Sequence, residues 1–439
     1  MKTIALSLIL GMSGFAAAGY KEAEAAMKNV ETAQIAQISK DLDALLPQSG
    51  AALARDARAA ALLSENQQAM ELFRQAAEAP NEGYLFAPKP EKYSTKTPLP
   101  KFFSQMRLFR LLLIEAKIKL AEKQPGPAEK DLLAAAGLIL QLSGQKSAVL
   151  LSSMVGQLCL NLAYPVMSDS IKNPSVSPAY LKELAARLAK AANSQDAMKA
   201  AVLDETAMWK GAMREGVNAE AMALEREKLP FWKRPAAKKL QDQEFFTTVY
   251  ANYDAAVDAY AGVLTGAFRA NDPAPVVSFL EKRGREVAAR KAARVKKGFF
   301  SELVDGLKGG PEMKKKMGEV IVDTMLEIAT PAYEKTIPRY HFFLCELNVL
   351  RAGLAVKLYQ RGRRRLPDGL DQLVPGFLAA VPQDSFNKFA PLSYIKIGKK
   401  FSVYSFGPDG KDGGGAAAMD YKGYIDDPAR SAGDIVFAD

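Results

Sequence analysis

The sequence predicts a mainly α-helical protein: an irregular helical-pair bundle or array, followed by a long helix and a small α/β module with an antiparallel sheet. Apolar residues recur every three or four positions through most of residues 20–362, which is the period of an amphipathic helix. Prolines separate these stretches where helices are expected to end. Only the last 74 residues change character, with a strand-like run and a glycine-rich loop.

The first two predicted helices lie between the N-terminus and a proline-rich loop. Residues 20–46 carry apolar side chains three and four positions apart, and Pro47 ends this helix. An alanine-rich helix follows at 51–79, and repeated prolines exclude a regular helix from the loop at 80–100. Further helices are expected at 101–123, 127–143, 147–168, 178–192, 195–226, 239–269, 274–296, 311–329 and 332–362. No period of about 34 residues recurs, so we expect helix pairs rather than a regular tetratricopeptide repeat.

The run Tyr404–Gly415 is typical of a cation-binding loop. A strand ends at Phe406, and a proline and a glycine bracket a tight turn at Asp409. Three consecutive glycines then let the backbone fold back, so that carboxylates and carbonyls can converge. Asp412 lies in the loop, and Asp434 returns from a later segment. Calcium takes about six to eight oxygen ligands, so this pattern predicts a calcium site.

The loop belongs to an ordered series of motifs within the last 74 residues. The segments are Leu366–Leu373, Val381–Phe386, Pro391–Tyr394, Tyr404–Gly415 and Gly433–Ile435. In order and spacing, residues 366–439 resemble the globular part of the major pseudopilin of bacterial type II secretion systems. The corresponding family motifs are Tyr-Pro followed by a leucine, Pro-x-Asp-Pro-Trp, Pro-Tyr-x-Tyr, Ser-Leu-Gly-x-Asp-Gly and a closing Asp-Ile.

The pseudopilin resemblance implies a calcium ion held by the carbonyl of Phe406 and by Asp409 and Asp434. The Asp-Asp pair of the family is broken here, because Gly433 stands at its first position, and the loop is longer. The missing ligand would come from another aspartate: Asp412, Asp420 or Asp427. The alternative is a solvated Asp/Gly turn that binds no metal.

The N-terminus indicates export. Lys2 precedes the apolar run Ile4–Leu10, and Ala16–Ala18 offers an Ala-x-Ala cleavage site, so we expect a Sec-type signal peptide. The first cysteine is Cys159, which excludes a lipoprotein anchor. A pseudopilin would carry a prepilin cleavage site before a long apolar helix. The chain therefore resembles that family only at its C-terminal end and is not expected to polymerise as a pilin; we expect it in the periplasm or secreted.

The charge of the chain points to anionic partners. The formal net charge is +10, and basic residues cluster at 282–297, 314–316 and 361–365. Export and the lack of interleaved aromatic residues argue against nucleic acid, so we expect no nucleic-acid partner. Anionic envelope polymers or lipid headgroups are better candidates. The alternative is that these runs are ordinary solvated helix faces.

Two apolar features have structural interpretations. Cys159 and Cys345 lie in apolar helical contexts, so buried free thiols are expected, with a disulfide between them as the alternative. Ser147–Ser168 is a run of 22 residues without a charge, long enough to span a bilayer. Its serine, glutamine, asparagine and proline residues favour the core helix of a bundle over a membrane span.

The sequence lacks a catalytic motif. His341 is the sole histidine and lies in an aromatic helical run, which is typical of a core or helix-face histidine. The chain contains no His-Glu-x-x-His, Cys-x-x-Cys, phosphate-binding or dinucleotide-binding motif. Carboxylates are numerous on the predicted helices, but their spacing defines no pair. We therefore expect no enzymatic activity.

A second resemblance covers most of the mature chain. The helix Leu347–Tyr359 has the form Leu-x-x-x-Arg-Ala-x-Leu-Ala-x-x-x-Tyr, and it runs into the pseudopilin-like module. This arrangement is similar to a class of exported bacterial proteins in which a helical body precedes such a helix. The expected domains are a signal peptide at 1–18, a helical domain at 19–330, and the long helix with the calcium module at 331–439.

Together these observations predict an exported, non-enzymatic scaffold or binding protein of the cell envelope with a calcium-stabilised, pseudopilin-like C-terminal module. Its partners would be envelope proteins or anionic envelope polymers. One alternative is an adaptor or component of a type II secretion or pilus-like assembly that engages secretion or pilus components. The other is an envelope enzyme acting on a polymer.

Overall fold

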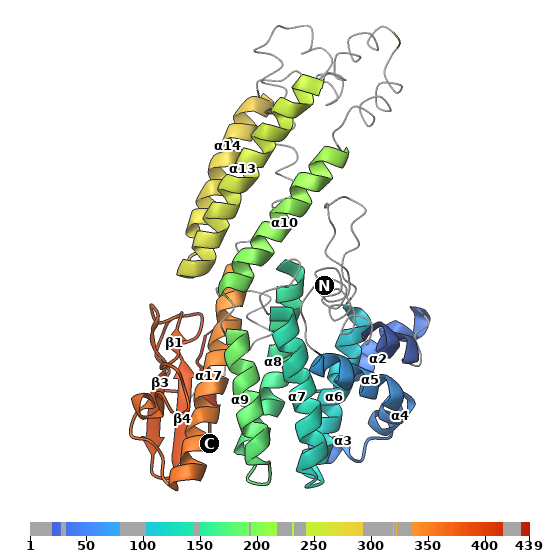
Figure 1. The fold of residues 1–439 in the computed structure, drawn as a ribbon, viewed down its shortest axis with the longest axis vertical. Helices are drawn as coiled ribbons and strands as arrows, with labels where there is room; N and C mark the ends of the chain where they lie inside the picture. Colours follow the sequence, from blue (N-terminus) through green and yellow to red (C-terminus); the bar gives the residue numbers. More distant parts are fainter. Residues whose placement is uncertain are drawn as a thin grey trace, which may run out of the picture. The chain divides into compact units, whose positions relative to one another are not determined.

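The computed structural model confirms a mainly helical protein with a small antiparallel sheet near its C-terminus (Figure 1). It describes residues 20–27, 32–79, 102–143, 150–192, 195–216, 231, 243–292, 319, 322, 336–415 and 432–439. The predicted signal peptide at 1–18 and the predicted helix at 311–329, apart from residues 319 and 322, lie outside this part of the chain. So do Asp420 and Asp427.

The chain forms two compact units. The first comprises residues 1–89, 99–200 and 338–439, and the second comprises 90–98 and 201–337. A boundary between the units falls at residues 337/338, near the expected 330/331, but the segment after it is not a unit of its own, because the long C-terminal helix and the sheet belong to the same unit as the N-terminal helices. This difference arises from contacts between residues far apart in the chain, which a local sequence pattern does not show.

The first unit is built on a bundle of helices. Its N-terminal helices are α2 (Thr32–Leu45), α3 (Gly50–Leu53), α4 (Ala57–Glu65) and α5 (Gln67–Glu78). Its central helices are α6 (Phe103–Ala121), α7 (Pro125–Ser143), α8 (Leu150–Lys172) and α9 (Pro178–Ala192). Leu108, Phe109 and Leu112 of α6 are fully buried, as are Leu132 and Ile139 of α7. These helices are apolar on several sides because they occupy the centre of the bundle.

The alanine-rich stretch predicted as one helix is divided into α3, α4 and α5. Asp56 caps α4, since its carboxylate accepts hydrogen bonds from the amides of Arg58 and Ala59. Asn66 leaves the helical conformation between α4 and α5, with φ −109° and ψ 13°. Local side-chain capping therefore interrupts a run that composition alone marks as continuous.

The candidate membrane span is α8. Among the described residues it is the one helix long and apolar enough to cross a bilayer, judged by length and composition. In its most apolar window, 56% of the residues are buried within the unit. Cys159, Leu160 and Met167 of this helix are fully buried. This burial supports the interpretation as a core helix.

The C-terminal part of the first unit places a long helix against a sheet. Its elements are α17 (Thr336–Arg363), β1 (Gln383–Asp384), β2 (Ala390–Pro391), β3 (Ser393–Ile397), β4 (Lys400–Ser405) and β5 (Ile435–Ala438). β1 and β2 form a two-stranded sheet, and β3, β4 and β5 form an antiparallel three-stranded sheet in that order. Val403 in the middle strand pairs with Tyr394 and Phe437, and it is fully buried.

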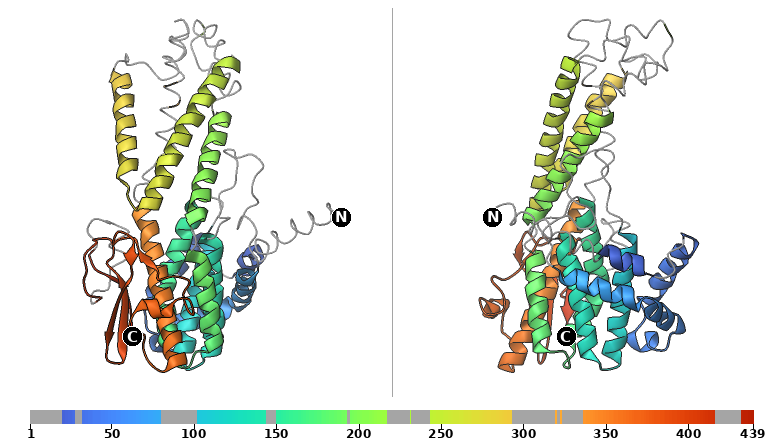
Figure 2. Two further views of the ribbon diagram at one scale, coloured as in Figure 1. Left: turned by 60° about the vertical axis from the view of Figure 1, so that its left-hand side comes forward. Right: turned by 45° about the vertical axis from the view of Figure 1, so that its right-hand side comes forward.

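α17 lies between this sheet and the helical bundle, as Figures 1 and 2 show from different sides. A side chain at Gly353 would come within 2.5 Å of the Phe437 ring, so glycine allows the helix to lie close to the sheet. On its other side, Glu346 contacts Asn161 of α8, and Arg361 donates hydrogen bonds to two carbonyls of the α8–α9 loop. These contacts explain why the C-terminal module is part of the first unit.

The second unit contains most of α10 (Gln195–Gly216) together with α13 (Gln243–Ala270) and α14 (Ala274–Ala292) (Figure 2). Lys210 of α10 forms an ion pair with Asp258 of α13, with 2.6 Å between Nζ and Oδ1. Trp209 packs against Tyr260, with 5.9 Å between their ring centroids. The basic run expected at 282–297 is described only to Ala292, and the run at 314–316 lies outside the described residues.

Candidate functional site

The C-terminal loop leaves β4 through a tight turn. Gly407 and Gly410 adopt left-handed conformations, with φ of +70° and +64°. A side chain at Gly407 would lie 2.2 Å from the carbonyl oxygen of Gly433. Glycine is therefore required where the loop meets the segment that returns to form β5.

Asp434 closes this loop. Its side chain is fully buried, and its carboxylate accepts hydrogen bonds from the backbone amides of Gly413 (3.1 Å) and Gly415 (2.7 Å). Hydrogen bonds to an ionised carboxylate are roughly twice as strong as those between neutral groups. Asp434 thus holds the three-glycine segment against the start of β5.

Asp412 bonds to the same segment. Its Oδ1 accepts hydrogen bonds from the hydroxyl of Tyr404 (3.0 Å) and from the amide of Gly414 (2.9 Å). An ionised carboxylate has about four lone-pair sites. Asp412 and Asp434 each use two for these contacts, so both carboxylates retain acceptor capacity for a cation.

Asp409 and Phe406 make other contacts. Oδ1 of Asp409 accepts a hydrogen bond from the amide of Lys411 (3.1 Å), within its own turn. The amide of Phe406 donates to Asp384 (2.8 Å). Within the described part of the chain, no three acidic, histidine or cysteine side chains come together closely enough to hold a metal.

The loop therefore fits calcium only in part. Carboxylate oxygens suit this hard cation, and Asp412 and Asp434 supply them at one three-glycine segment. Asp409 does not join them in a group of three ligands. The amides of the segment point at the two carboxylates, so the loop also has a closing interaction that needs no metal.

Asp384 holds the base of this loop, a role that the metal-ligand pattern of the sequence did not indicate. Its buried carboxylate accepts hydrogen bonds from the hydroxyl of Ser405 (2.7 Å) and from the amides of Phe406 (2.8 Å) and Phe386 (2.9 Å). The thiol of Cys345 on α17 lies 3.5 Å from the same oxygen that Ser405 contacts. The sequence held one indication of this role, because Asp384 lies in the segment Val381–Phe386, which resembles the family motif Pro-x-Asp-Pro-Trp.

Both cysteines are free and buried, as expected. The sulfur of Cys159 lies 3.4 Å from that of Met106, and Cys345 Sγ lies 3.2 Å from the hydroxyl of Ser385. Burial raises the pKa of the Cys345 thiol to about 12 and also raises the pKa of Cys159. Neither sulfur is therefore a thiolate at neutral pH, which argues against nucleophilic chemistry at these residues.

His341 is a core residue. It is fully buried on α17, and its ring makes edge contacts with the rings of Tyr340 and Phe389 at 5.3 and 6.0 Å between centroids. This matches the expected core histidine.

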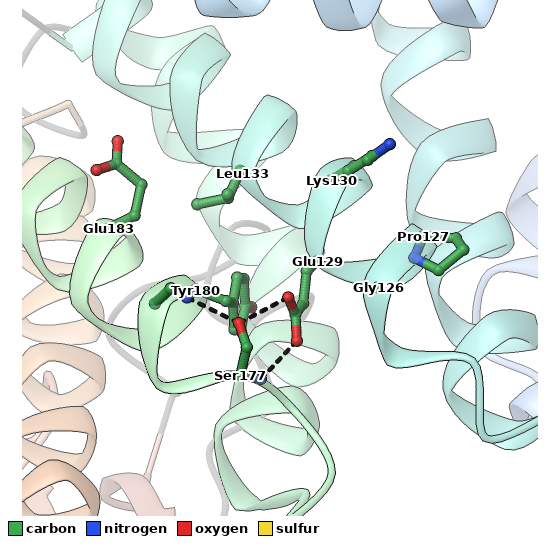
Figure 3. A pocket seen from close by; sticks show the side chains of 9 residues that line it. Gly126, Pro127, Glu129, Lys130, Leu133, Ser177, Tyr180 and Glu183 are labelled. Carbon is green, nitrogen blue, oxygen red and sulfur yellow. Dashed lines mark hydrogen bonds between the residues drawn. The ribbon is translucent and has the colours of Figure 1, made fainter.

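A surface pocket of about 540 Å³ lies between the first turns of α7 and α9 (Figure 3). Its lining residues are Gly126, Pro127, Glu129, Lys130, Leu133, Ser177, Ala179, Tyr180 and Glu183. The helical periodicity of the sequence carried no signal for it, because its residues come from two segments about fifty positions apart and meet only in the folded bundle.

The polar groups at the floor of the pocket hold the two helices together. The carboxylate of Glu129 accepts hydrogen bonds from the amide (2.6 Å) and the hydroxyl (2.8 Å) of Ser177. The hydroxyl oxygen of Ser177 in turn accepts a hydrogen bond from the amide of Tyr180 (3.0 Å), so Ser177 caps the N-terminus of α9. Figure 3 shows the charged ends of Lys130 and Glu183 away from this cluster. The pocket therefore presents no convergent pair of reactive groups.

Two buried carboxyl groups of the bundle have perturbed acidity. Burial raises the pKa of Asp131 on α7 to about 7, although its Oδ1 pairs with Nε of Arg74 at 2.7 Å. Burial likewise raises the pKa of Glu346 on α17 to about 8, against a hydrogen bond of 3.1 Å from Asn161. Neither group lies in the pocket or in the C-terminal loop, so we assign both carboxyl groups a structural role in the packing of the bundle.

No protein-family model matches this chain, and no curated protein sequence or solved structure is significantly similar to it. The resemblance of residues 366–439 to the major pseudopilin therefore stays a prediction, as does the resemblance of the whole chain to exported helical proteins.

Proposed function

We propose that this chain is an exported, non-enzymatic scaffold or binding protein of the cell envelope, in which calcium stabilises the C-terminal loop. The observation that supports the calcium site is the pair Asp412 and Asp434, whose carboxylates both accept hydrogen bonds from amides of the Gly413–Gly415 segment and have acceptor capacity left over. Phe406 and Asp409 are the further ligands that the pseudopilin resemblance implies.

The structural use of the polar groups supports a scaffold. Asp384, Asp434 and Glu129 each accept at least two hydrogen bonds that fix a turn, a loop or a helix end. Both thiols and the histidine are buried. Catalysis needs an accessible group poised near a substrate position. The described cavity offers none, and the module is packed on the bundle through α17, as expected for a scaffold.

The proposal is tested by measuring calcium binding to the mature full chain. Isothermal titration should detect one calcium ion, and thermal unfolding should shift upward with calcium relative to chelator. Calcium at about a hundredfold excess over its Kd contributes roughly 2.7 kcal/mol to the free energy of unfolding. Asp412→Asn should remove the binding, because it keeps the one oxygen that accepts from Tyr404 and Gly414 and deletes the charge. Asp434→Asn should remove it as well, but it also costs one hydrogen bond of the loop, since the two oxygens of Asp434 each accept from a different glycine amide.

Asp368→Asn is the matched control, since Asp368 is an exposed aspartate of the same module that pairs with Lys396 outside the loop. It should leave calcium binding unchanged. Asp409→Asn tests the calcium ligands that the pseudopilin resemblance implies. If this variant loses calcium binding, Asp409 is one of the ligands. A wild-type chain whose titration shows no heat and whose thermal unfolding does not respond to calcium would refute calcium binding. The loop would then be closed by the hydrogen bonds of Asp412 and Asp434 alone.

A further inference from the structure

The β3–β4 hairpin ends in an exposed apolar residue surrounded by lysines. Gly398 and Lys399 form its two-residue loop, and Gly398 has a φ of +61°. Ile397, the last residue of β3, is 73% exposed. Lys396 and Lys400 flank this tip and are exposed as well. The exposed isoleucine contributes little to the core and places an apolar side chain among the lysines of the hairpin end.

A second basic group lies beside the hairpin. α17 ends in Arg363, and Arg364 and Arg365 follow; all three are exposed. Asp368 joins the two groups: one of its oxygens lies 2.7 Å from Nζ of Lys396, and the other lies 3.6 Å from Nη1 of Arg365. Figures 1 and 2 show the hairpin alongside the C-terminal part of α17.

We name this surface the basic tip and define it as Arg363, Arg364, Arg365, Lys396, Ile397, Lys399 and Lys400. Its six cations and the nearby Asp368 give a net charge of +5 (6 − 1). The end of α17 is held in place, because the guanidinium of Arg361 donates hydrogen bonds of 2.8 Å to the carbonyls of Asn173 and Val176. The charges therefore project from a fixed support.

We propose that the basic tip docks onto an anionic lipid bilayer, with Ile397 entering the interfacial layer. A negative lipid surface attracts juxtaposed lysines and arginines, and it can also bury an apolar side chain. Lysine stems lie along apolar surface while their ammonium groups stay among the headgroups. A charged polysaccharide satisfies the cations but offers Ile397 no apolar environment. The bilayer accounts for both features of the tip.

This inference does not rest on the calcium site, which uses other residues. The two proposals can therefore fail separately. The tip carries a single exposed isoleucine and no exposed aromatic residue, so the docking is reversible and depends on salt.

The test is co-sedimentation of the mature full chain with vesicles of phosphatidylcholine, alone or mixed with phosphatidylglycerol. The wild type should sediment with the anionic vesicles at low salt, and less at physiological salt. Replacing Lys399 and Lys400 by glutamine should weaken this binding by roughly fivefold for each charge removed. The control replaces two exposed lysines of α9, Lys182 and Lys190, by glutamine and should leave binding unchanged.

Ile397→Ser separates the bilayer from a soluble polyanion. The substitution lies at an exposed hairpin end and preserves the charge, so the chain should fold normally. It should weaken vesicle binding while leaving heparin binding as in the wild type. Vesicle binding that ignores the anionic lipid, or that is the same with Ile397→Ser as with the wild type, would overturn the inference; equal loss in the α9 control would do so as well.

Discussion

Two buried carboxyl groups of the first unit have opposite hydrogen-bond environments. Asp384 accepts hydrogen bonds from one hydroxyl and two amides, so its charge is well compensated. Within the described part of the chain, Glu346 accepts one hydrogen bond, from Asn161, and its Oε2 has no hydrogen-bond partner. A compensated buried carboxylate stabilises its surroundings, whereas a poorly compensated one holds its proton. Each residue therefore carries a different prediction.

Asp384→Ala should destabilise the protein strongly. The substitution leaves the hydroxyl of Ser405 and the amides of Phe406 and Phe386 without their acceptor in a buried site. Each such group costs about 1–3 kcal/mol, so we expect a loss of at least about 3 kcal/mol in urea unfolding. Asp258→Ala removes only an exposed ion pair and should cost less than about 1 kcal/mol. Equal effects of the two variants would contradict the role of Asp384.

Glu346→Gln should reduce the pH dependence of stability. The folded state keeps the Glu346 proton up to a pKa of about 8, whereas the unfolded state releases it above about 4.5. Between these values the folded state binds more protons, so the free energy of unfolding falls as pH rises, by at most about 1.4 kcal/mol per pH unit. The variant should remove this contribution, and Asp131 should supply the slope that remains below pH 7.

The measurement is urea unfolding of wild type and variant across that pH range. Glu281→Gln is the control, because Glu281 is 63% exposed and its ion pair with Arg285 is long, at 3.8 Å. It should leave the slope unchanged. A variant at residue 346 whose stability falls with pH as steeply as the wild type would show that Glu346 is ionised in the folded protein.

At the scale of elements, α17 organises the first unit. It contacts the sheet through Gly353 and Phe437, and it contacts α8 through Glu346. The hydroxyl of Tyr164 on α8 also donates a hydrogen bond to the carbonyl of Val436 in β5 (2.9 Å). One helix and one strand thus tie the C-terminal module to the bundle.

Glycine substitutions in two helices test this packing. Gly353→Ala should destabilise by about 1–3 kcal/mol, because the new methyl group would meet the Phe437 ring at 2.5 Å. Among the described residues, a methyl group at Gly262 in α13 would meet no atom outside its own helix within 4 Å, so Gly262→Ala should stabilise by up to about 1 kcal/mol, since alanine favours helix. Thermal unfolding of the two variants measures both. Opposite signs support the close contact of α17 with the sheet, and two stabilising substitutions would exclude it.

At the scale of the whole molecule, the C-terminal module should not fold alone. A fragment of residues 336–439 loses the partners of Glu346, Arg361 and the carbonyl of Val436, and it exposes the face of α17 that the bundle covers. We expect this fragment to lack a cooperative thermal transition by circular dichroism, whereas the mature full chain has one. A fragment that unfolds cooperatively would support the separate C-terminal domain expected for residues 331–439.

Export of the whole chain is tested by its mature N-terminus. Signal peptidase should cleave after Ala18, where small residues follow the apolar run. Intact-mass analysis of exported protein should give a chain that begins at Gly19. A chain that begins at Met1 or Phe15 would contradict the predicted signal peptide.

The sequence by itself determined the helical class, the small C-terminal sheet and the burial of both thiols. These depend on short-range periodicity and composition, which every helix and strand carries locally. The apolar helical contexts of Cys159 and Cys345 predicted their burial and favoured free thiols over a disulfide, and both are free and buried in the structure. Composition did not reveal the helix caps. Asp56 and Asn66 divide a stretch that the sequence pattern predicted as one helix.

Only the tertiary structure decided which residues meet. It placed α17 on α8, so the segment after the boundary at residues 337/338 belongs to the same compact unit as the N-terminal helices. It brought Asp412 and Asp434 to one glycine segment, left Asp409 in its own turn and made Asp384 the base of the loop. Such contacts join residues far apart in the chain, and their geometry depends on packing that no local pattern encodes.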